Sequence, residues 1–155
     1  MLLTLAGLTR DRYDRALAHV VKTDALGQDL WLKREIVARG GARVRVYPNT
    51  SIANAPLLAA EREARAANIG LWGTGAYRIP QATHLPQAFE RFQLVEGVVS
   101  CELGLTGSAL TLEIRRSAAA LCQVQGGTPV RARGYVYDGK LEIGHTLNLE
   151  TLACD

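Results

Sequence analysis

The sequence is poor in the residues that build metal sites and disulfide frameworks. It has three cysteines and three histidines in 155 residues, and no two cysteines form a C-x-x-C pair. These residues are Cys101, Cys122 and Cys154, with His19, His84 and His145. A structural zinc site is therefore not expected, and we expect the histidines to be structural or on the surface. The cysteines fit thiols in a reducing compartment, although one Cys101–Cys122 disulfide remains an alternative.

Long hydrophobic runs and familiar catalytic motifs are also absent. No apolar stretch approaches the roughly 18 residues that a membrane-spanning helix needs, so we expect no membrane partner. Residues 1–8 are apolar but lack a basic segment before them, which argues against a signal peptide in this chain. The sequence contains no P-loop, no G-x-G-x-x-G after a strand, no H-E-x-x-H and no G-x-S-x-G. The cellular location stays open.

Aromatic residues make up only 6% of the chain, charged residues 21% and hydrophobic residues 48%. This composition is typical of globular domains and excludes a disordered tail, a collagen-like repeat and a coiled coil. The net charge of +3 is unevenly spread, because residues 1–85 carry 12 Lys and Arg against 7 Asp and Glu, whereas residues 86–155 carry 6 against 8. The basic half suits a polyanion, although an ordinary solvated surface explains it equally well.

The first half of the chain mixes strand-like and helix-like patterns. The first predicted helix depends on Leu32 and Ile36, with Val37 as a further candidate, at positions i, i+4 and i+5 on one helical face. The second contains Pro56 in its first turn, where the missing N–H group costs nothing. Two strands, a helix, an extended stretch and a second helix are thus predicted at residues 2–5, 16–23, 29–39, 43–47 and 54–67.

The second half reads as a small β domain. Glycine and proline are frequent over residues 73–86, so we place a linker at residues 79–88, between a first domain at 1–78 and a second at 89–155. Asp138-Gly139 between two strand-like runs predicts a two-residue hairpin turn. Five short strands, which predict a small barrel or sandwich, are expected at residues 92–100, 109–114, 129–136, 140–143 and 146–152.

The segment that could carry chemistry is D-R-Y-D-R-A-L-A, at residues 11–18. It places Tyr13 between Arg12 and Arg15 on a turn that leads into a strand, so rigid backbone would hold the side chains. Guanidinium groups clamp phosphate through two hydrogen bonds, and a neighbouring tyrosine can stack on a base. The alternative is a salt-bridged start of a hairpin with no ligand.

The order of motifs in this half is informative. Residues 11–18 resemble the D-[KR]-Y-G-R-x-L-A motif of the staphylococcal nuclease (thermonuclease) family. Residues 32–44, L-K-R-E-I-V-A-R-G-G-A-R-V, resemble that family's V-x-E-x-L-[VL]-x-x-G-x-A-x-V, and Tyr47-Pro48 follows. Gly70-Leu71-Trp72 is similar to its closing G-[LI]-W. The resemblance covers residues 1–78, about half of the chain, and corresponds to the C-terminal half of the nuclease domain.

The resemblance implies roles for individual residues. Arg15 matches the catalytic arginine, which neutralises developing charge on the attacked phosphate. Arg12 and Tyr13 match nucleic-acid-binding positions near the terminal phosphate, and Trp72 matches a packing tryptophan. Asp14 departs from the family, which has glycine there; its carboxylate would either tether Arg15 or repel a phosphate.

The resemblance also implies what this chain is missing. In complete members a Ca²⁺ ion, a second arginine and a glutamate base come from strands upstream of the matched part. We therefore predict no metal ligand and no cofactor in this chain, although Ca²⁺ is expected for a complete member. The chain would be a truncated product, a short protein completed by self-association or a missing N-terminal segment, or one whose second half covers the open face. Full-length family members are often exported.

The second domain, with strand runs beginning at Phe92 and including R-A-R-G-Y-V at residues 131–136, resembles an OB-like extension found in some bacterial relatives. Its residues Phe92, Arg131, Arg133 and Tyr135 could form a modest platform for single strands, or the domain could be purely structural. The fold class expected is thus α+β: a partial OB-type barrel half with two helices, plus a small OB-like β-barrel domain.

Two functions follow as expectations. The first is a thermonuclease-like protein related to Ca²⁺-dependent hydrolases of DNA and RNA phosphodiesters. This chain is expected to be inactive, because a hydrolase without its metal ion and its general base lacks the interactions that supply most of its rate acceleration. The second is a non-catalytic module for nucleic-acid binding or assembly that keeps the scaffold. A remnant domain without a ligand is a third reading.

Overall fold

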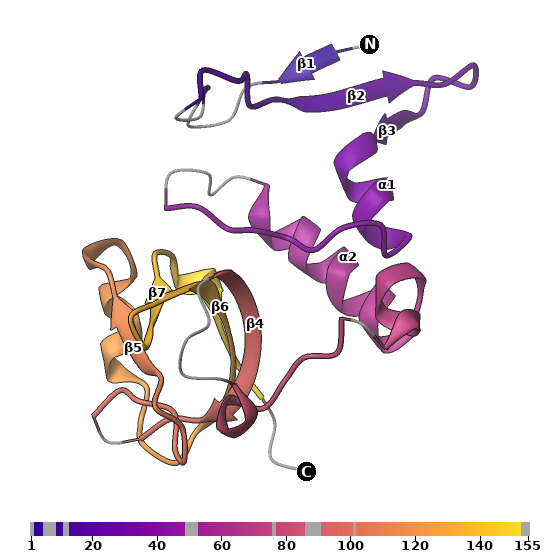
Figure 1. Ribbon diagram of the computed structural model, residues 1–155. Helices are drawn as coiled ribbons and strands as arrows, with labels where there is room; N and C mark the ends of the chain where they lie inside the picture. Colours follow the sequence, from indigo (N-terminus) through magenta and orange to yellow (C-terminus); the bar gives the residue numbers. More distant parts are fainter. Residues whose placement is uncertain are drawn as a thin grey trace. The chain divides into compact units, whose positions relative to one another are not determined.

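The computed structural model describes residues 2–4, 9–10, 13–48, 53–75, 77–85, 91–100 and 102–152. The chain divides into two compact units, Met1–Arg78 and Ile79–Asp155, called unit 1 and unit 2 below. Both helices and strands are present, with a three-stranded sheet in unit 1 and a five-stranded sheet in unit 2, so the α+β class is confirmed (Figure 1). None of the helices in the described part of the chain combines the length and apolar character that crossing a membrane requires.

The sheet of unit 1 is antiparallel and follows the order β1-β2-β3. Its strands are Leu2–Thr4, His19–Thr23 and Asp29–Trp31. The turn between β2 and β3 is held by Asp24, whose carboxylate accepts hydrogen bonds from the backbone N–H groups of Leu26 and Gln28 at 2.8 and 2.9 Å.

The helices of unit 1 are α1 (Leu32–Ala38), α2 (Asn54–Ala66) and the 3-10 helix η1 (Gly70–Thr74). The prediction of one helix over residues 29–39 was wrong at its start, because β3 occupies the first three of these residues. Trp31 donates a hydrogen bond from Nε1 to Nδ1 of His19 on β2 at 3.1 Å, and this bond favours strand pairing there. Residues 43–47 are extended but belong to no strand.

A glycine pair lets α1 and η1 cross closely. The N–H of Leu71 donates to the carbonyl oxygen of Gly40 at 2.9 Å. Gly40 and Gly70 have φ angles of 64° and 59°, and a Cβ at Gly40 would overlap the carbonyl of Ile69. Only glycine adopts such backbone at so short an approach.

The core of unit 1 lies between α1, α2 and the extended stretch. Because side chains alternate along residues 43–47, Val44 and Val46 point inward, and each is only 5% exposed. Glu61 of α2 is fully buried, and its Oε1 accepts the N–H of Val44 at 2.9 Å. A helix side chain therefore supplies the hydrogen bond that a neighbouring strand would otherwise supply. The buried apolar cluster consists of Val37, Val44, Val46, Leu57, Leu58 and Ala60.

Unit 2 is built on β4 to β8 and three short 3-10 helices, η2 to η4. The strands follow the order β4-β6-β7-β5, with β8 beside β6, and the β5–β7 pair is parallel. Asp138 and Gly139, with φ angles of 46° and 67°, form the predicted hairpin turn. The elements are β4 (Arg91–Val98), β5 (Thr111–Ile114), β6 (Pro129–Tyr137), β7 (Lys140–Ile143), β8 (Leu149–Thr151), η2 (Ala82–His84), η3 (Arg116–Gln123) and η4 (Thr146–Asn148).

The strands of unit 2 enclose one apolar core, whose buried members include Val95, Val130 and Leu141. Within the described residues, β4 to β8 alone do not form a closed ring. Isolated bridges Val99–Leu105 and Gly104–Thr111 connect the end of β4 to the beginning of β5. The last predicted strand, residues 146–152, was too long, because η4 occupies its first three positions.

Candidate nucleic-acid interface

The predicted motif forms a loop that feeds into β2. The N–H of Leu17 donates to the carbonyl oxygen of Thr9 at 2.8 Å, and Arg10 and Ala16 form an antiparallel bridge. Both ends of the loop are therefore anchored. Arg12 lies outside the described residues, so its predicted role stays a prediction.

The loop brings Arg15 and Tyr13 together. The Arg15 guanidinium carbon lies 5.2 Å from the centroid of the Tyr13 ring, within the range of a cation–π contact. Tyr13 is 64% exposed, and Arg15 is also exposed. A planar cation and an exposed ring thus stand side by side on the surface, an arrangement that can meet a phosphate and a base at once.

The structure resolves what Asp14 does in place of the family's glycine. Its φ angle is 61°, in the left-handed region that favours glycine. Its carboxylate pairs with Arg10 at 3.1 Å, and Arg10 also donates to the Asp14 carbonyl oxygen at 2.7 Å. The recorded ion pair of Asp14 is therefore with Arg10, on an exposed surface where such pairs contribute little.

Acidic groups of the same unit have structural partners. Asp24 holds the β2–β3 turn, and Asp29 accepts a hydrogen bond from the Thr23 hydroxyl at 2.7 Å. Within the described ranges, no three His, Cys, Asp or Glu side chains gather as metal ligands. The recorded contacts of Asp24 and Asp29 are therefore with the β2–β3 hairpin.

His19 has a structural role, as predicted. Its Nδ1 accepts the hydrogen bond from Trp31, and the two rings meet edge to face with centroids 5.1 Å apart. Burial, and secondarily the positive charge of Lys33, lower the pKa of His19 below its ordinary value of 6.5. A neutral imidazole with Nδ1 as acceptor fits this environment.

Unit 1 contains further arginine–aromatic pairs that sequence reasoning missed. The guanidinium carbons of Arg43 and Arg45 lie 5.3 and 4.9 Å from the ring centroids of Tyr77 and Tyr47. The signal was present in the R-V-R-V-Y pattern, because inward valines force both arginines and the tyrosine onto the other side. Tyr47 and Tyr77 are 44% and 40% exposed, so these rings remain accessible.

Arg131 and Arg133 of unit 2 have different surroundings. Arg131 donates to Glu96 at 2.9 and 2.5 Å and to Glu150 at 3.3 Å. Arg133 is only 4% exposed. Of the residues suggested as a single-strand platform, Phe92 and Tyr135 face each other across β4 and β6. Of the two cations that the platform requires, Arg133 is therefore buried, and Arg131, whose side chain is 15% exposed, is engaged by two carboxylates.

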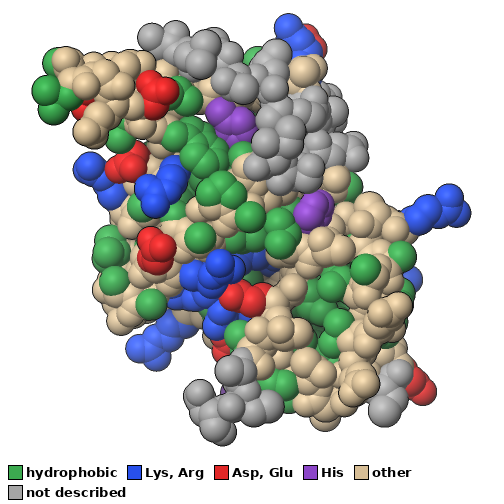
Figure 2. Space-filling view, turned by 180° about the vertical axis from the view of Figure 1, so that it is seen from behind, with side chains coloured by type: hydrophobic (Ala, Val, Ile, Leu, Met, Phe, Trp, Pro, Cys, Tyr) green, Lys and Arg blue, Asp and Glu red, His purple; other side chains and the backbone are tan. Residues whose placement is uncertain are grey.

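A second carboxylate-bound arginine lies on the β5–β7 side. Arg115 contacts Glu113 at 3.2 Å and Glu142 at 3.2 Å, and donates to the Tyr137 hydroxyl at 3.3 Å. The hydrogen bond to Glu142 raises the pKa of Arg115. Figure 2 shows how blue and red side chains stand together on the face that it presents, with hydrophobic ones between them.

The family model described as "Staphylococcal nuclease homologue" matches residues 3–74, and this confirms the predicted resemblance for that segment. No curated protein matches the chain.

Proposed function

We propose, from the premise that residues 3–74 are a domain of the staphylococcal nuclease homologue family, that this nuclease-related protein binds single-stranded nucleic acid through unit 1. The observation that carries the proposal is the Arg15–Tyr13 pair, exposed on an anchored loop within that domain. Arg15 contacts the phosphate, and Tyr13 stacks on the adjoining base. Arg12 is proposed as a further phosphate contact.

The chemistry of the surface supports this function. A guanidinium group binds phosphate oxygens through parallel hydrogen bonds, and base stacking on an aromatic ring contributes about 1–3 kcal/mol per base. Arg45 over Tyr47 repeats the same combination on the extended stretch. Because every base has a flat face, the expected binding depends on salt more than on sequence.

We further propose that this chain does not hydrolyse the nucleic acid by itself. Phosphodiester cleavage needs a metal ion or a positioned base in addition to a cation. Asp14, Asp24 and Asp29 hold other groups of unit 1, as described above. Arg15 can stabilise negative charge but cannot generate the attacking hydroxide, and Ca²⁺ would belong to a complete family member.

Binding is tested with fluorescently labelled single-stranded DNA and RNA at a series of salt concentrations. We expect Arg15→Ala and Tyr13→Ala each to weaken binding about tenfold. Arg116→Ala is the matched control, since this exposed arginine of unit 2 lies outside the proposed surface. Affinity that ignores salt, or falls equally in all three variants, contradicts the proposal.

Catalysis is tested separately, with the same substrates in Ca²⁺ and in EDTA. We expect no cleavage under either condition. Ca²⁺-dependent cleavage that Arg15→Ala abolishes would overturn the proposed inactivity and leave the proposed contact residue in place.

Unit 2 has a second candidate role, as an OB-like scaffold for assembly. Its support is the pairing scheme: five strand segments, the end of β4 linked to β5 by the 103–106 segment, and a parallel β5–β7 pair, which suits a partly open Greek-key barrel.

In unit 1, β1 and β3 are the edges of the described sheet, so we propose that an added strand, from a second copy or a further segment, pairs there. Light scattering tests self-association.

A further inference from the structure

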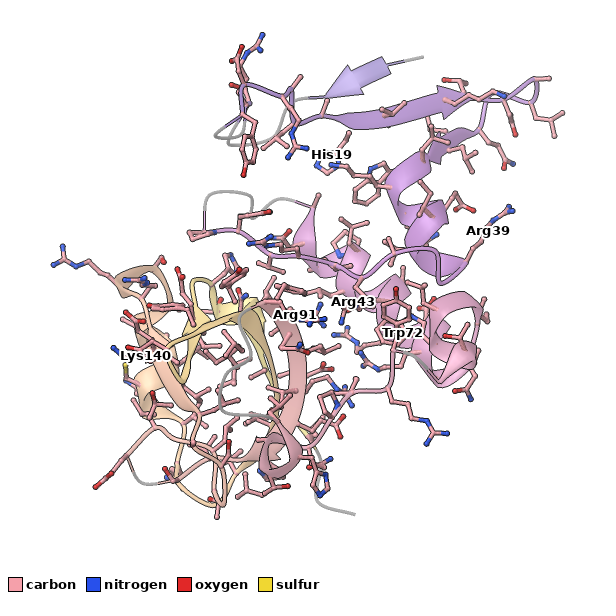
Figure 3. The ribbon with its side chains drawn as sticks, in the orientation of Figure 1. His19, Arg39, Arg43, Trp72, Arg91 and Lys140 are labelled. Carbon is pink, nitrogen blue, oxygen red and sulfur yellow. The ribbon has the colours of Figure 1, made fainter. Side chains whose placement is uncertain are left out.

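The loop that carries Arg15 and Tyr13 also holds an arginine that the proposed contact does not use. Arg10 forms an antiparallel bridge with Ala16, the residue after Arg15, so it lies at the base of the same loop. The loop leads into β2, whose first residue, His19, is labelled in Figure 3. The predicted motif begins at residue 11, so no role was expected for Arg10 from the sequence.

Asp14 contacts Arg10 through two of its atoms. Nη1 of Arg10 donates a hydrogen bond to the backbone carbonyl oxygen of Asp14 at 2.7 Å and lies 3.1 Å from the carboxylate oxygen Oδ1. The carbonyl oxygen fixes the position of the guanidinium group, and the carboxylate compensates its charge. Carboxylate and phosphate oxygens are equivalent acceptors for a guanidinium group, so Asp14 occupies a donor that a phosphate could use.

The pair is open to exchange with solvent anions. The side chains of Arg10 and Asp14 are 60% and 85% exposed, and ion pairs at such positions contribute little to stability. Residues 10–15, R-D-R-Y-D-R, carry three arginines against two aspartates. Removal of one carboxylate therefore raises the net charge of this short segment from +1 to +2, which favours a polyanion.

We propose that Asp14 regulates the affinity of this loop for nucleic acid. Its carboxylate holds Arg10 in a neutral pair, and Arg10 becomes a further phosphate contact once that carboxylate is displaced or removed. The inference rests on the proposed function, since it concerns the same loop, and it adds a residue that limits binding to those that support it.

The backbone of Asp14 makes a clean test possible. Its φ angle of 61° lies in the left-handed region, which asparagine tolerates better than most residues. Asp14→Asn therefore removes the charge and keeps the size, the backbone and the carbonyl oxygen that positions Arg10. We expect this variant to bind single-stranded DNA and RNA about fivefold more tightly. The slope of log affinity against log salt should steepen by about one.

A second substitution shows whether the gain comes from Arg10. In an Arg10→Gln background, Asp14→Asn should lose most of its effect, because no paired cation is left to release. An equal gain with and without Arg10 would mean that the carboxylate acts only by repelling phosphate, and it would overturn the proposal. Unchanged or weaker binding by Asp14→Asn itself would overturn it as well.

Glu35→Gln is the matched control. Arg34 and Glu35 form another partly exposed ion pair of unit 1, at 3.6 Å on α1, so this variant changes the net charge by the same amount outside the loop. We expect its affinity and salt slope to match those of the unmodified chain. A gain equal to that of Asp14→Asn would indicate a general effect of charge and contradict the proposal.

The same titrations separate this inference from the proposed function. If Arg15→Ala weakens binding while Asp14→Asn binds as the unmodified chain does, the inference fails and the proposed contact stands. If Asp14→Asn gains affinity through Arg10 while Arg15→Ala has no effect, the proposed contact fails and Arg10 is the phosphate-binding residue. No binding by either the unmodified chain or Asp14→Asn overturns both, and circular dichroism verifies that each variant is folded.

Discussion

Several arginines of the two units differ in their recorded partners, although in unit 1 Arg10 also pairs with Asp14. In unit 1, Arg15, Arg45 and Arg65 lie over aromatic rings. In unit 2, Arg115 and Arg131 each lie between two carboxylates. A ring attracts the flat face of a guanidinium group without neutralising its charge, whereas two carboxylates use both its charge and its donors.

The difference decides what each surface can recruit. A stacked cation keeps its positive charge, and salt should screen its attraction for a phosphate. A cation between carboxylates contributes to the fold and offers no attraction to a polyanion. The uneven charge of the sequence, with its basic first half, points the same way. The charge count and the contacts of the arginines therefore point to the same unit, unit 1, as the proposed nucleic-acid surface.

The largest expected effect comes from a substitution that disrupts the close approach of α1 and η1 in unit 1. Gly40→Ala should lower the free energy of unfolding by about 3 kcal/mol or more, because a Cβ would overlap the Ile69 carbonyl at a left-handed φ. Gly27→Ala is the matched control: its φ is 77° but nothing lies near the added carbon, so about 1 kcal/mol is expected. Urea unfolding measures both, and equal losses would refute the steric argument.

The next effect tests unit 2. Arg131→Gln leaves Glu96 and Glu150 facing each other on a partly buried surface, and it should destabilise the protein by about 2 kcal/mol. Nucleic-acid binding should not change. The reverse experiment, Glu96→Gln with Glu150→Gln, releases Arg131 and should add salt-dependent affinity. Loss of binding in Arg131→Gln, at a temperature where this variant stays folded, would contradict the contrast drawn between the arginines of the two units.

A smaller effect is expected for single cations on the binding side. Arg45→Gln should reduce affinity for single strands about fivefold and lower the slope of log affinity against log salt by about one. Arg115→Gln, whose cation already lies between carboxylates, should leave both quantities unchanged. Anisotropy titrations at several salt concentrations measure the two variants together.

The smallest effect concerns pH. Because the folded-state pKa of His19 is lowered, the unfolded chain takes up the proton first as pH falls, so stability is highest above about pH 6.5 and decreases below it. His19→Gln should flatten that decrease. Urea midpoints between about pH 5 and pH 7.5 give the slopes, and identical slopes in both proteins would show that His19 is not responsible.

Local patterns predicted much of this fold. The second helix was expected at residues 54–67 and spans Asn54–Ala66, and the Asp138-Gly139 turn joins β6 and β7 as expected. The first helix was placed on Leu32, Ile36 and Val37, of which Val37 is buried but Ile36 is 51% exposed. Periodicity over so short a helix does not identify its inner face, and pairing with β2 drew Asp29–Trp31 into the sheet.

The contacts of the candidate residues also differ in how far they could be predicted from the sequence. Tyr13 and Arg15 are neighbours in sequence, so the motif could suggest their contact. The partners of Arg131 are 35 and 19 residues away in the chain, at Glu96 and Glu150. Strand register sets those contacts, and a sequence pattern does not reveal register between distant strands.

The bond from Val44 to Glu61 has a dynamic consequence. Residues 43–47 belong to no strand, yet the Val44 amide is held by a fully buried carboxylate on α2. Exchange of that amide with solvent requires the extended stretch to separate from the helix, so both should open as one cooperative segment. The arginines carried by the stretch therefore keep their positions as long as the helix does, and a slow-exchanging amide outside any sheet would mark that coupling.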